Sequence, residues 1–599
     1  MSKSRKELPY EARVLIAFLA SVLVMAAWSY YFRPEPPRPK PPEQSGPAQP
    51  TSEHDKQPVD PTQQPGKTQP GATPPSVAAT KEQPPRAARA TTAVQGEGER
   101  TLVVENGVYR VLLSNRGGVV ESWQLLGYTD SQKDGKTLDV VDSETGRGTG
   151  AWPLSIAVAD KELNNKINSA IFEVTPATGP IEAPAEVVFR WSDGVARVTK
   201  RLRFDDSYMV AISTSIEQNG RPVPHSITWR GGFGDRAAYQ HADQTFVIYR
   251  TAGALHSLPY KNLGQPEARE EWFQQPETMD YAGIADRYFT AVFVSDGAGA
   301  PAASTAAGLT LWHSIRQHET TVNGKKQTSP VPEIAVGPAS QSAFDVRLYV
   351  GPKDVEVLAR QQPPMTELVD FGWDWIEPIS RLLFVFLKWI HTYVPSWGWA
   401  IVIMTFAIIM ALYPLKVKSW RSMQRMQKLM PEMQQIKQRY TKYKFNDPRK
   451  QQEQQEMMAL YKKHGMSPLG GVGGCLPMLL QMPIWFALYQ MLGAAIELRH
   501  ARWLWIRDLA SPDPFYVLPI FMAVSMYASQ KMTPVTTPDP AQARMMNMMP
   551  VIFGGMFVIF PVSSGLVLYI FTSMLVGMAQ QWYLNRSNPL KKKVRDERK

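Results

Sequence analysis

Two glutamines and two prolines interrupt a long uncharged stretch in the C-terminal third of the chain. Residues 464–496 contain no Asp, Glu, Lys or Arg, and about 20 helical residues are enough to cross the ~30 Å hydrocarbon core of a bilayer. The stretch nevertheless carries Pro477, Gln481, Pro483 and Gln490. In lipid, amides and freed backbone groups must be satisfied by neighbouring helices or by a wet cavity. These residues therefore predict a membrane helix that forms one wall of a polar site.

Catalytic and metal-binding patterns are missing from residues 101–350, which contain no His-Glu-x-x-His, no Gly-x-Ser-x-Gly and no phosphate-binding loop. The histidines of this region are scattered, and we expect them at surfaces and in turns: His225, His241, His256, His313 and His318. The one cysteine of the chain, Cys475, excludes disulfides and multi-cysteine metal sites within the chain. We predict no enzyme, no metal and no cofactor.

The N-terminal part reads as a membrane anchor followed by a tether. Residues 14–32 are uncharged, follow a short basic segment and end in aromatic residues. This length favours an uncleaved anchor (1–33) over a cleaved signal peptide, whose apolar part is typically ~7–15 residues long, and the basic flank places the N-terminus in the cytoplasm. Residues 34–99 are rich in proline and polar residues, which predicts an extended, disordered tether.

Residues 100–352 are predicted to form an all-β sandwich domain. Segments such as 186–191 and 196–204 alternate apolar and polar residues or are rich in β-branched and aromatic ones, and turn signals such as Asn219-Gly separate many of them. The pattern lacks long helical periodicity, which is typical of a sandwich. We expect this domain to serve as an interaction or spacer domain on the outer side of the membrane.

An amphipathic helix and five further membrane spans are predicted after the β domain. Residues 366–395 combine an apolar surface with Ser380, Arg381, Lys388 and His391 on one helical face, which favours an interfacial helix over the core helix of a soluble domain. The uncharged stretch 545–585 is about twice too long for one span, so we divide it near Pro561. The five spans of the core (396–586) are expected at 397–415, 475–496, 515–530, 545–560 and 565–585.

Basic residues gather on one side of these six spans. Residues 416–463 contain thirteen Lys or Arg and four acids, and the tail 587–599 is also basic, so both termini are predicted to be cytoplasmic. We expect a helical hairpin at 417–465, where a methionine stripe serves either packing or docking of apolar partners. The docking residues would be Arg421, Met423, Arg425, Met426, Met430 and Met433. The net charge of +11 indicates orientation and contact with anionic lipids rather than specific nucleic-acid binding.

Several motifs resemble the bacterial branch of the Oxa-type membrane protein insertases. They include Cys475-Leu-Pro-Met-Leu-Leu-Gln-Met-Pro483, Leu504-Trp-Ile-Arg-Asp-Leu509 and Ser564-Gly-Leu-Val-Leu-Tyr569. The resemblance spans nearly the whole chain and implies an energy-independent insertase and membrane chaperone of the inner membrane. Its partners would be nascent membrane proteins, the Sec translocon with its accessory subunits, and the ribosome, which would contact the basic loops and tail.

The resemblance also implies a hydrophilic groove that is open to the cytoplasm and to lipid. This sequence departs from the family at Ile409, where an arginine is usual, and in a Gly-rich turn at 470–474 that is longer than usual. Without that arginine, hydroxyls, amides and water are expected to make the groove polar. The expected groove residues are Thr405, Ile409, Gln481, Met482, Pro483, Trp485, Gln490, Ser525, Phe560, Ser563, Ser564 and Thr572.

Three other function classes compete with insertion. A solute transporter is expected to show paired halves with broken helices, and the sequence shows no such repeat. An intramembrane enzyme is expected to carry acidic or histidine residues in its spans, and the predicted spans carry none. An assembly scaffold without insertion activity stays open, because Ile409 removes a charge that an insertion groove would use.

Overall fold

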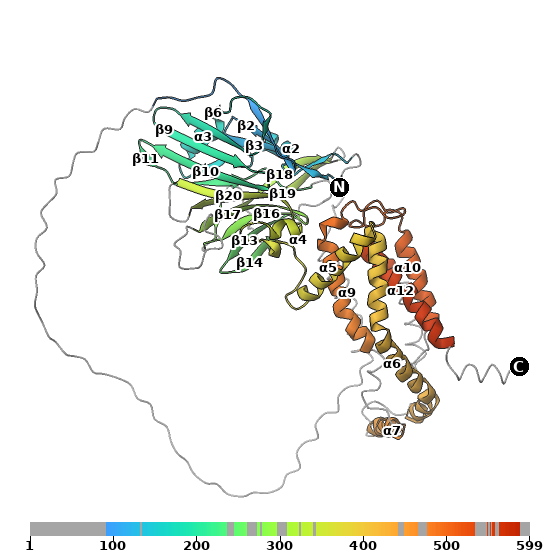
Figure 1. The fold of residues 1–599 in the computed structure, drawn as a ribbon. Coiled ribbons are helices and arrows are strands. Elements are labelled where there is room, and N and C mark those ends of the chain that lie inside the picture. The colour runs from blue at the N-terminus through green and yellow to red at the C-terminus, as the bar shows by residue number, and fades with distance from the viewer. Residues whose placement is uncertain are drawn as a thin grey trace, which may run out of the picture.

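The computed structural model describes most of the chain beyond the predicted tether (Figure 1). The described residues are 92–131, 135–235, 245–259, 272–275, 278–295, 308–322, 325–338, 343–440, 449–464, 476–532, 548, 552, 554–557 and 562–586. The predicted anchor (1–33), most of the tether and the basic tail (587–599) lie outside the described residues.

Three sheets form the β domain (Figure 1). The first has the order β4 (Thr137–Asp139), β3 (Val119–Thr129), β2 (Tyr109–Ser114), β1 (Thr101–Glu105) and β7 (Ile181–Glu182). The second has the order β14 (Ala254–Pro259), β13 (Phe246–Thr251), β16 (Tyr281–Ala285), β17 (Phe289–Ser295), β20 (Ala343–Pro352), β10 (Met209–Gln218), β9 (Ala196–Phe204), β8 (Ala185–Ser192) and β6 (Glu173–Thr175), with β11 (Arg221–Pro222) beside β10. The third has the order β15 (Phe273–Gln274), β18 (Leu309–Val322), β19 (Lys325–Pro338), β12 (His225–Trp229) and β5 (Ile156–Val158).

Alternation along the strands explains how the sandwich closes on one core. In β9, every second residue from Ala196 to Phe204 is buried, while Arg197, Arg201 and Arg203 are exposed, as the period of two in a strand requires. Lys200 is the one charged residue among the buried positions of β9. Its Nζ donates to the carbonyls of Gly118 at 2.6 Å and of Leu154 at 2.7 Å. The predicted β-sandwich is confirmed.

Short helices fill the edges of the β domain, and a bundle of longer helices follows it. The short ones are α2 (Ser143–Thr149), α3 (Lys161–Ser169), α4 (Val355–Ala359) and the 3₁₀ turn η3 (Thr366–Leu368). The bundle comprises α5 (Glu377–Tyr393), α6 (Trp397–Tyr440), α9 (Leu476–Ala494), the turn η4 (Ile496–Leu498), α10 (Val517–Met532) and α12 (Ser564–Arg586), and α7 (Arg449–Lys463) packs on the far end of α6 (Figure 1).

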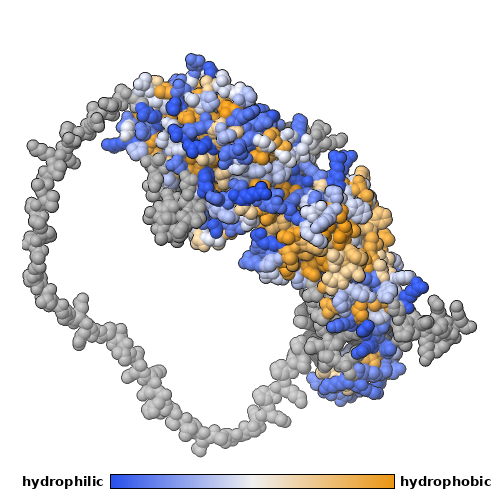
Figure 2. All heavy atoms as spheres, viewed as in Figure 1, coloured by the Kyte–Doolittle hydropathy of each residue, from blue (hydrophilic) through white to orange (hydrophobic). Residues whose placement is uncertain are grey.

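Helix α6 is the longest helix of the bundle and contacts α5, α9 and α12. It continues without a break through Pro414 and Pro431, so it joins the predicted span at 397–415 directly to the predicted hairpin. Among the described residues, one helical stretch, Trp397–Arg421, is long and apolar enough to cross a membrane by length and composition. The count of six spans therefore stays a prediction. In Figure 2, hydrophobic side chains gather over the bundle, whereas the β domain shows a largely hydrophilic face.

The predicted interfacial helix corresponds to α5, which packs beside α9 in the bundle (Figure 1). One of its faces is buried, and the Ser380 hydroxyl donates to the Ala487 carbonyl of α9 at 3.2 Å. The opposite face exposes Leu382, Val385 and Trp389. An exposed apolar face on a helix at the end of an apolar bundle is what contact with lipid would require.

Candidate functional site

A hydrogen bond between two buried or half-buried side chains links helices α9 and α12. Gln481 Nε2 donates to the hydroxyl oxygen of Tyr569 at 2.7 Å, and Tyr569 is 1% exposed. Tyr569, Ser573, Gly577 and Gln580 are four, four and three residues apart, so they share one face of α12. The two helices thus present polar groups to each other inside an otherwise apolar bundle.

Three other predicted groove residues with hydroxyl groups are buried in the same bundle. Thr405 of α6 is fully buried, and its Oγ1 donates to the Ile401 carbonyl of its own helix at 2.6 Å. Ser525 of α10 and Thr572 of α12 are each 7% exposed. Because α12 packs against both α6 and α10, these hydroxyls lie on three helices that are in contact. Ile409, one turn beyond Thr405, is also buried.

The predicted residues of α9 do not all lie together. Met482 is exposed, while Pro483 and Trp485 are half-buried. Gln490 is nine residues beyond Gln481, which is about 13 Å along a helix, and it packs against Gly372. A Cβ on Gly372 would lie 2.8 Å from Gln490 Cγ. Gln490 therefore belongs to the contact with the segment before α5, not to the Gln481–Tyr569 pair.

Ser563 and Ser564 lie where α12 begins. The amide and hydroxyl of Ser564 each donate to the Ser511 carbonyl at 2.8 Å, and Ser564 is fully buried. The Ser563 carbonyl accepts from the amide of Leu566 at 3.1 Å. These serines hold the start of the helix, because the first turn has amides without partners inside the helix. Phe560 lies outside the described residues.

Lys416 is a polar member of the bundle that the sequence reasoning missed. Its Nζ donates to the Gly577 carbonyl at 3.2 Å and to Gln580 Oε1 at 3.0 Å, both on α12. The predicted span ended at Leu415, whereas the apolar helix extends to Arg421. Seven residues separate Ile409 from Lys416, so both lie on one face of α6. The seven-residue spacing in the sequence could have revealed that Lys416 places a positive charge on the helix face that carries Ile409.

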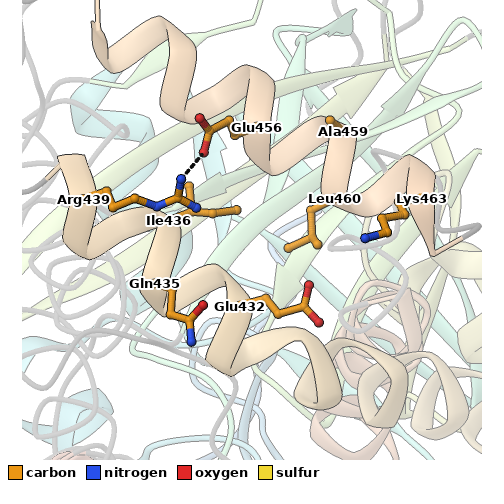
Figure 3. Close-up of a pocket in the computed structure, with 8 residues that line it drawn as sticks. All are labelled: Glu432, Gln435, Ile436, Arg439, Glu456, Ala459, Leu460 and Lys463. Atoms are coloured by element: carbon orange, nitrogen blue, oxygen red, sulfur yellow. Dashed lines mark ion pairs between the residues drawn. The ribbon is translucent and has the colours of Figure 1, made fainter.

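The hairpin of α7 and the end of α6 has a small core of its own. Met433 is buried beside Leu429, Ile436 and Leu460, so this methionine packs between α6 and α7. Arg421 and Arg425 are exposed. The side chains of Met423, Met426 and Met430 are outside the described set. A cavity of about 320 Å³ opens between the two helices (Figure 3), lined by Glu432, Gln435, Ile436, Arg439, Glu456, Ala459, Leu460 and Lys463.

Both parts of the chain match known families. Residues 101–386 match the YidC periplasmic domain, and residues 389–592 match the 60Kd inner membrane protein. Membrane protein insertase YidC of Geotalea daltonii is 31% identical over 607 residues, which cover 97% of this chain and 100% of the relative. The chain belongs to the YidC family of membrane protein insertases. The Oxa-type resemblance is thereby confirmed.

Another YidC relative agrees with this assignment, and a solved YidC structure is also similar to the chain. Membrane protein insertase YidC of Cupriavidus pinatubonensis is 30% identical over 503 residues, which cover 82% of this chain and 84% of the relative. A crystal structure of an active YidC insertase with its first transmembrane domain resolved covers 83% of this chain and 96% of its own, at 17% identity and a TM-score of 0.33. The YidC family is an inner-membrane family with a periplasmic domain, and its members are named as insertases, not as enzymes.

The charge in α6 lies at a different position from the one that the resemblance implies. Ile409 is buried where the resemblance led us to expect a cation, and Lys416 carries a positive charge two turns further along the same face. Among the described residues, no group of His, Cys, Asp or Glu is arranged to hold a metal ion. The polar groups that the described parts of α6, α9, α10 and α12 place between them include hydroxyls, amides and this ammonium.

Proposed function

We propose that this chain is a membrane protein insertase and membrane chaperone that moves nascent transmembrane segments from the cytoplasm into the inner membrane. The observation that carries the proposal is the hydrogen bond of Gln481 to Tyr569 across two apolar helices. Such a pair stabilises the packing of helices in lipid, and its amide and hydroxyl are also groups with which an entering polar segment can exchange hydrogen bonds. A surface that receives polar segments inside the membrane needs polar groups of this kind as hydrogen-bond partners.

In this mechanism the protein lowers the free-energy barrier for moving a polar segment into the membrane, and no step is coupled to an external energy source. A polar segment that enters lipid loses the hydrogen bonds of its backbone, at several kcal/mol per group. A half-channel lined by Thr405, Gln481, Ser525 and Thr572, together with water, would supply partners over part of the membrane thickness. The substrate's own apolar helix then drives the step as it leaves water. No nucleotide is required.

Short spans would assist by thinning the bilayer locally. Helix α10 has 16 residues, fewer than the ~20 that cross an average core, and the predicted span 545–560 is similar in length. A thinner bilayer shortens the distance over which a polar segment is deprived of water. Both effects act on the same barrier.

Substrates are proposed to slide along α9 and the 545–560 span, in contact with Met482, Pro483, Trp485 and Phe560. Met482 is exposed, whereas Pro483 and Trp485, the other two that the structure describes, are half-buried. A photoreactive residue at Met482 is expected to crosslink to a nascent span, whereas one at Val524, on the exposed apolar side of α10, is expected to label lipid. Crosslinks from Val524 but none from Met482 would refute this path.

The proposed topology has six spans with both termini in the cytoplasm and the β domain in the periplasm. Its support is the positive charge of residues 416–463 and of the tail. The exposed Arg421 and Arg425 of the hairpin would contact the ribosome or anionic lipids, and Met423, Met426 and Met430 would meet apolar partners. The chain would work alone or beside the Sec translocon and its accessory subunits.

Complementation tests the proposal. A host depleted of its own insertase would express this chain, and insertion of a small Sec-independent protein with an acidic outer segment would be followed. Rescue is expected, because the polar bundle and Lys416 would together replace the usual arginine. Failure with rescue by Ile409→Arg would assign the chain to less acidic substrates. Failure of both, with the protein stable in the membrane, would favour the scaffold.

A further inference from the structure

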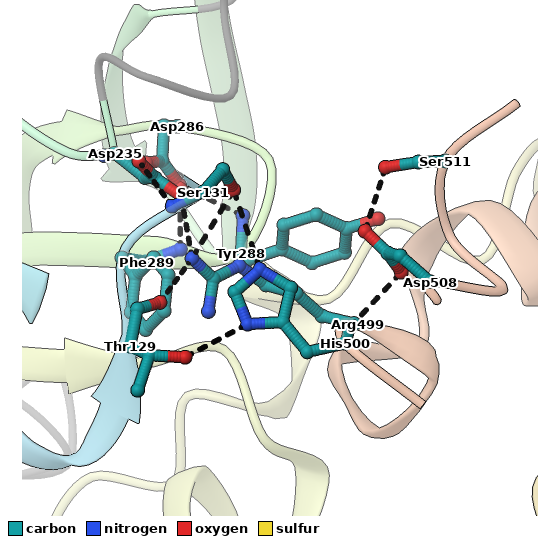
Figure 4. Close-up of polar contacts among 10 residues, drawn as sticks. All are labelled: Thr129, Ser131, Asp235, Asp286, Tyr288, Phe289, Arg499, His500, Asp508 and Ser511. Atoms are coloured by element: carbon teal, nitrogen blue, oxygen red, sulfur yellow. Dashed lines mark hydrogen bonds and ion pairs between the residues drawn. The ribbon is translucent and has the colours of Figure 1, made fainter. Parts of the chain in front are cut away.

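Arg499, in the loop that joins α9 to α10, inserts its side chain into the β domain (Figure 4). The side chains of Arg499 and Asp235 are 4% and 2% exposed, and they form an ion pair. Arg499 Nη2 also donates to the Thr129 carbonyl at 2.6 Å, and its guanidinium lies 5.3 Å from the centre of the Phe289 ring. The buried guanidinium therefore has a carboxylate, a carbonyl and an aromatic face around it, as a desolvated cation requires.

The β domain builds this acceptor site by itself. Asp235 accepts from the Ser131 amide at 3.3 Å and from its hydroxyl at 2.6 Å. The amide of Asp235 donates to Asp286 Oδ2 at 3.1 Å, and Asp286 is fully buried between β16 and β17, where it also accepts from the amides of Tyr288 and Phe289. The carboxylate that receives Arg499 is thus held in place by the segments after β3 and between β16 and β17 (Figure 4).

The loop that carries Arg499 is internally braced. We define the 496–513 loop as the residues from the turn η4 to Asp513. His500 Nδ1 lies 2.9 Å from Thr129 Oγ1 of the β domain, and the His500 amide donates to Asp508 Oδ1 at 3.0 Å. Asp508 Oδ2 accepts from the Ser511 hydroxyl at 2.6 Å. The backbone of His500 has a φ of +59°, which is uncommon for a residue other than glycine. Such a conformation persists where the surrounding contacts hold it.

The first turns of two helices of the bundle, α10 and α12, are hydrogen-bonded to this loop. The carbonyls of Ser511 and Leu509 accept from the amides of Ser564 and Gly565 at 2.8 Å each, where α12 begins. Asp513 Oδ2 accepts from the Leu518 amide of α10 at 2.8 Å. Carbonyl and carboxylate oxygens satisfy amides that a first helical turn leaves without partners.

The end of α9 is held by a third contact. Arg287, between β16 and β17, donates through Nε to the Gly493 carbonyl at 2.8 Å. A cation at this end satisfies a carbonyl that the last turn leaves free and complements the helix dipole. The β domain thus reaches the ends of α9, α10 and α12 through Arg287 and the 496–513 loop.

We propose that Asp235 and Arg499 are positioning residues for insertion: through the 496–513 loop, the β domain sets where α9 ends and where α10 and α12 begin, and so aligns the polar groups between them. The effect on insertion rests on the proposed function, whereas the coupling of the β domain to α12 does not. A buried ion pair is either formed or broken, so it holds the loop in one arrangement. The alternative is that the pair merely stabilises the fold.

The test compares Arg499→Gln, Asp235→Asn and Arg499→Lys in the full chain in membrane vesicles. The control is Arg116→Gln, which breaks the exposed ion pair of Arg116 with Glu99. The first readout is hydrogen exchange at the amides of Ser564 and Gly565, and the second is the insertion rate of a single-span substrate. Exchange requires no insertion activity, so it tests the coupling even if the chain inserts nothing.

Arg499→Gln and Asp235→Asn are expected to raise exchange at Ser564 and Gly565 about tenfold or more, because each leaves a buried group without its partner, and to slow insertion. Arg499→Lys is expected to restore both towards the wild type, since it keeps the charge, and Arg116→Gln to leave both unchanged. Unchanged exchange in the two single variants would overturn the proposal. So would faster exchange with a normal insertion rate.

A fold-stabilising role alone is distinguished by where exchange increases. If the two variants raise exchange equally in the β strands and at Ser564, the pair serves stability and the proposal is overturned. If either variant protein is not recovered from membranes, the proposal is judged on Arg499→Lys. Recovery of this variant at the wild-type level, with exchange at Ser564 as slow as in the wild type, supports the proposal. Loss of its recovery overturns the proposal. Failure of the wild type to insert, with exchange as expected, would refute only the proposed function.

Discussion

The Gln481 amide and the Tyr569 hydroxyl meet at 2.7 Å although 88 residues separate them in the chain. Helix α9 packs mainly against α5, whereas α12 packs mainly against α10 and α6. Their hydrogen bond therefore joins two halves of the bundle. It also marks the place where a polar segment would find partners inside the membrane.

Removal of this hydrogen bond tests its role. Tyr569→Phe is expected to destabilise the bundle by about 0.6–2 kcal/mol, the range for interhelical hydrogen bonds in membranes, and to slow insertion. Thermal unfolding in detergent and an insertion assay would measure the two effects. Tyr527→Phe, on the exposed face of α10, is the matched control and is expected to change neither. Equal behaviour of the two variants would contradict the role of Tyr569.

Lys416 is expected to favour substrates with acidic outer segments. Its ammonium lies against Gly577 and Gln580 of α12, so Lys416→Met removes a positive charge from the bundle. In this variant the free-energy barrier to insertion is expected to rise by about 1 kcal/mol for each acidic residue in the substrate's outer segment, which slows insertion roughly fivefold per residue. A substrate series with increasing numbers of aspartates in its outer segment would measure the slope.

The exposed Lys418 provides the control for that series. Lys418→Met removes the same charge two residues away and is expected to leave the dependence on acidic residues intact. A uniform loss for neutral and acidic substrates in Lys416→Met would show that the lysine only supports the packing of α6 on α12.

Gly398 permits the close approach of α6 to the 496–513 loop. A Cβ at this position would lie 2.2 Å from Trp503 Cγ, so Gly398→Val forces the indole or the helix to move. Overpacking of this kind costs about 1–3 kcal/mol, and a lower unfolding temperature is expected. Gly555→Ala is the control, because a Cβ there would meet nothing within 4 Å. Unaltered stability of Gly398→Val would show that this contact is not formed.

The stability of the β domain is expected to fall in acid because of His225. Burial lowers the pKa of His225 below its ordinary value of 6.5, and its ring nitrogens lie 2.7 Å from Thr214 Oγ1 and 3.0 Å from the Val223 carbonyl. Below about pH 6.5 the unfolded chain binds a proton that the folded domain resists. Stability from this group is therefore complete above pH 6.5 and declines as the pH falls towards the folded pKa.

Pulse proteolysis in urea between about pH 7 and pH 5 would measure this slope, since that interval spans the ordinary histidine pKa. His225→Gln stays neutral across the interval and is expected to flatten the slope, whereas His256→Gln, at an exposed position, is expected to retain it. An unchanged slope in His225→Gln would assign the acid sensitivity to other groups, of which the buried His313, also with a lowered pKa, is the next candidate.

The sequence by itself determined the β-sandwich and the family, because both depend on local patterns. Strand alternation, as in residues 196–204, is a period-two signal that any sheet with one buried face must follow. Membrane segments follow from uncharged length, since hydropathy is a sum over neighbouring residues. Lys416 was left out of the predicted span for the same reason: a charge ended the uncharged run, although the apolar helix continues to Arg421.

Only the tertiary structure decided which polar groups meet. Gln481 and Gln490 look alike in the sequence, yet one bonds to Tyr569 and the other packs on Gly372. Arg499 pairs with Asp235 across 264 residues. Such partners depend on how each helix is rotated and on which elements lie beside it, and neither quantity is encoded in the composition of a single segment.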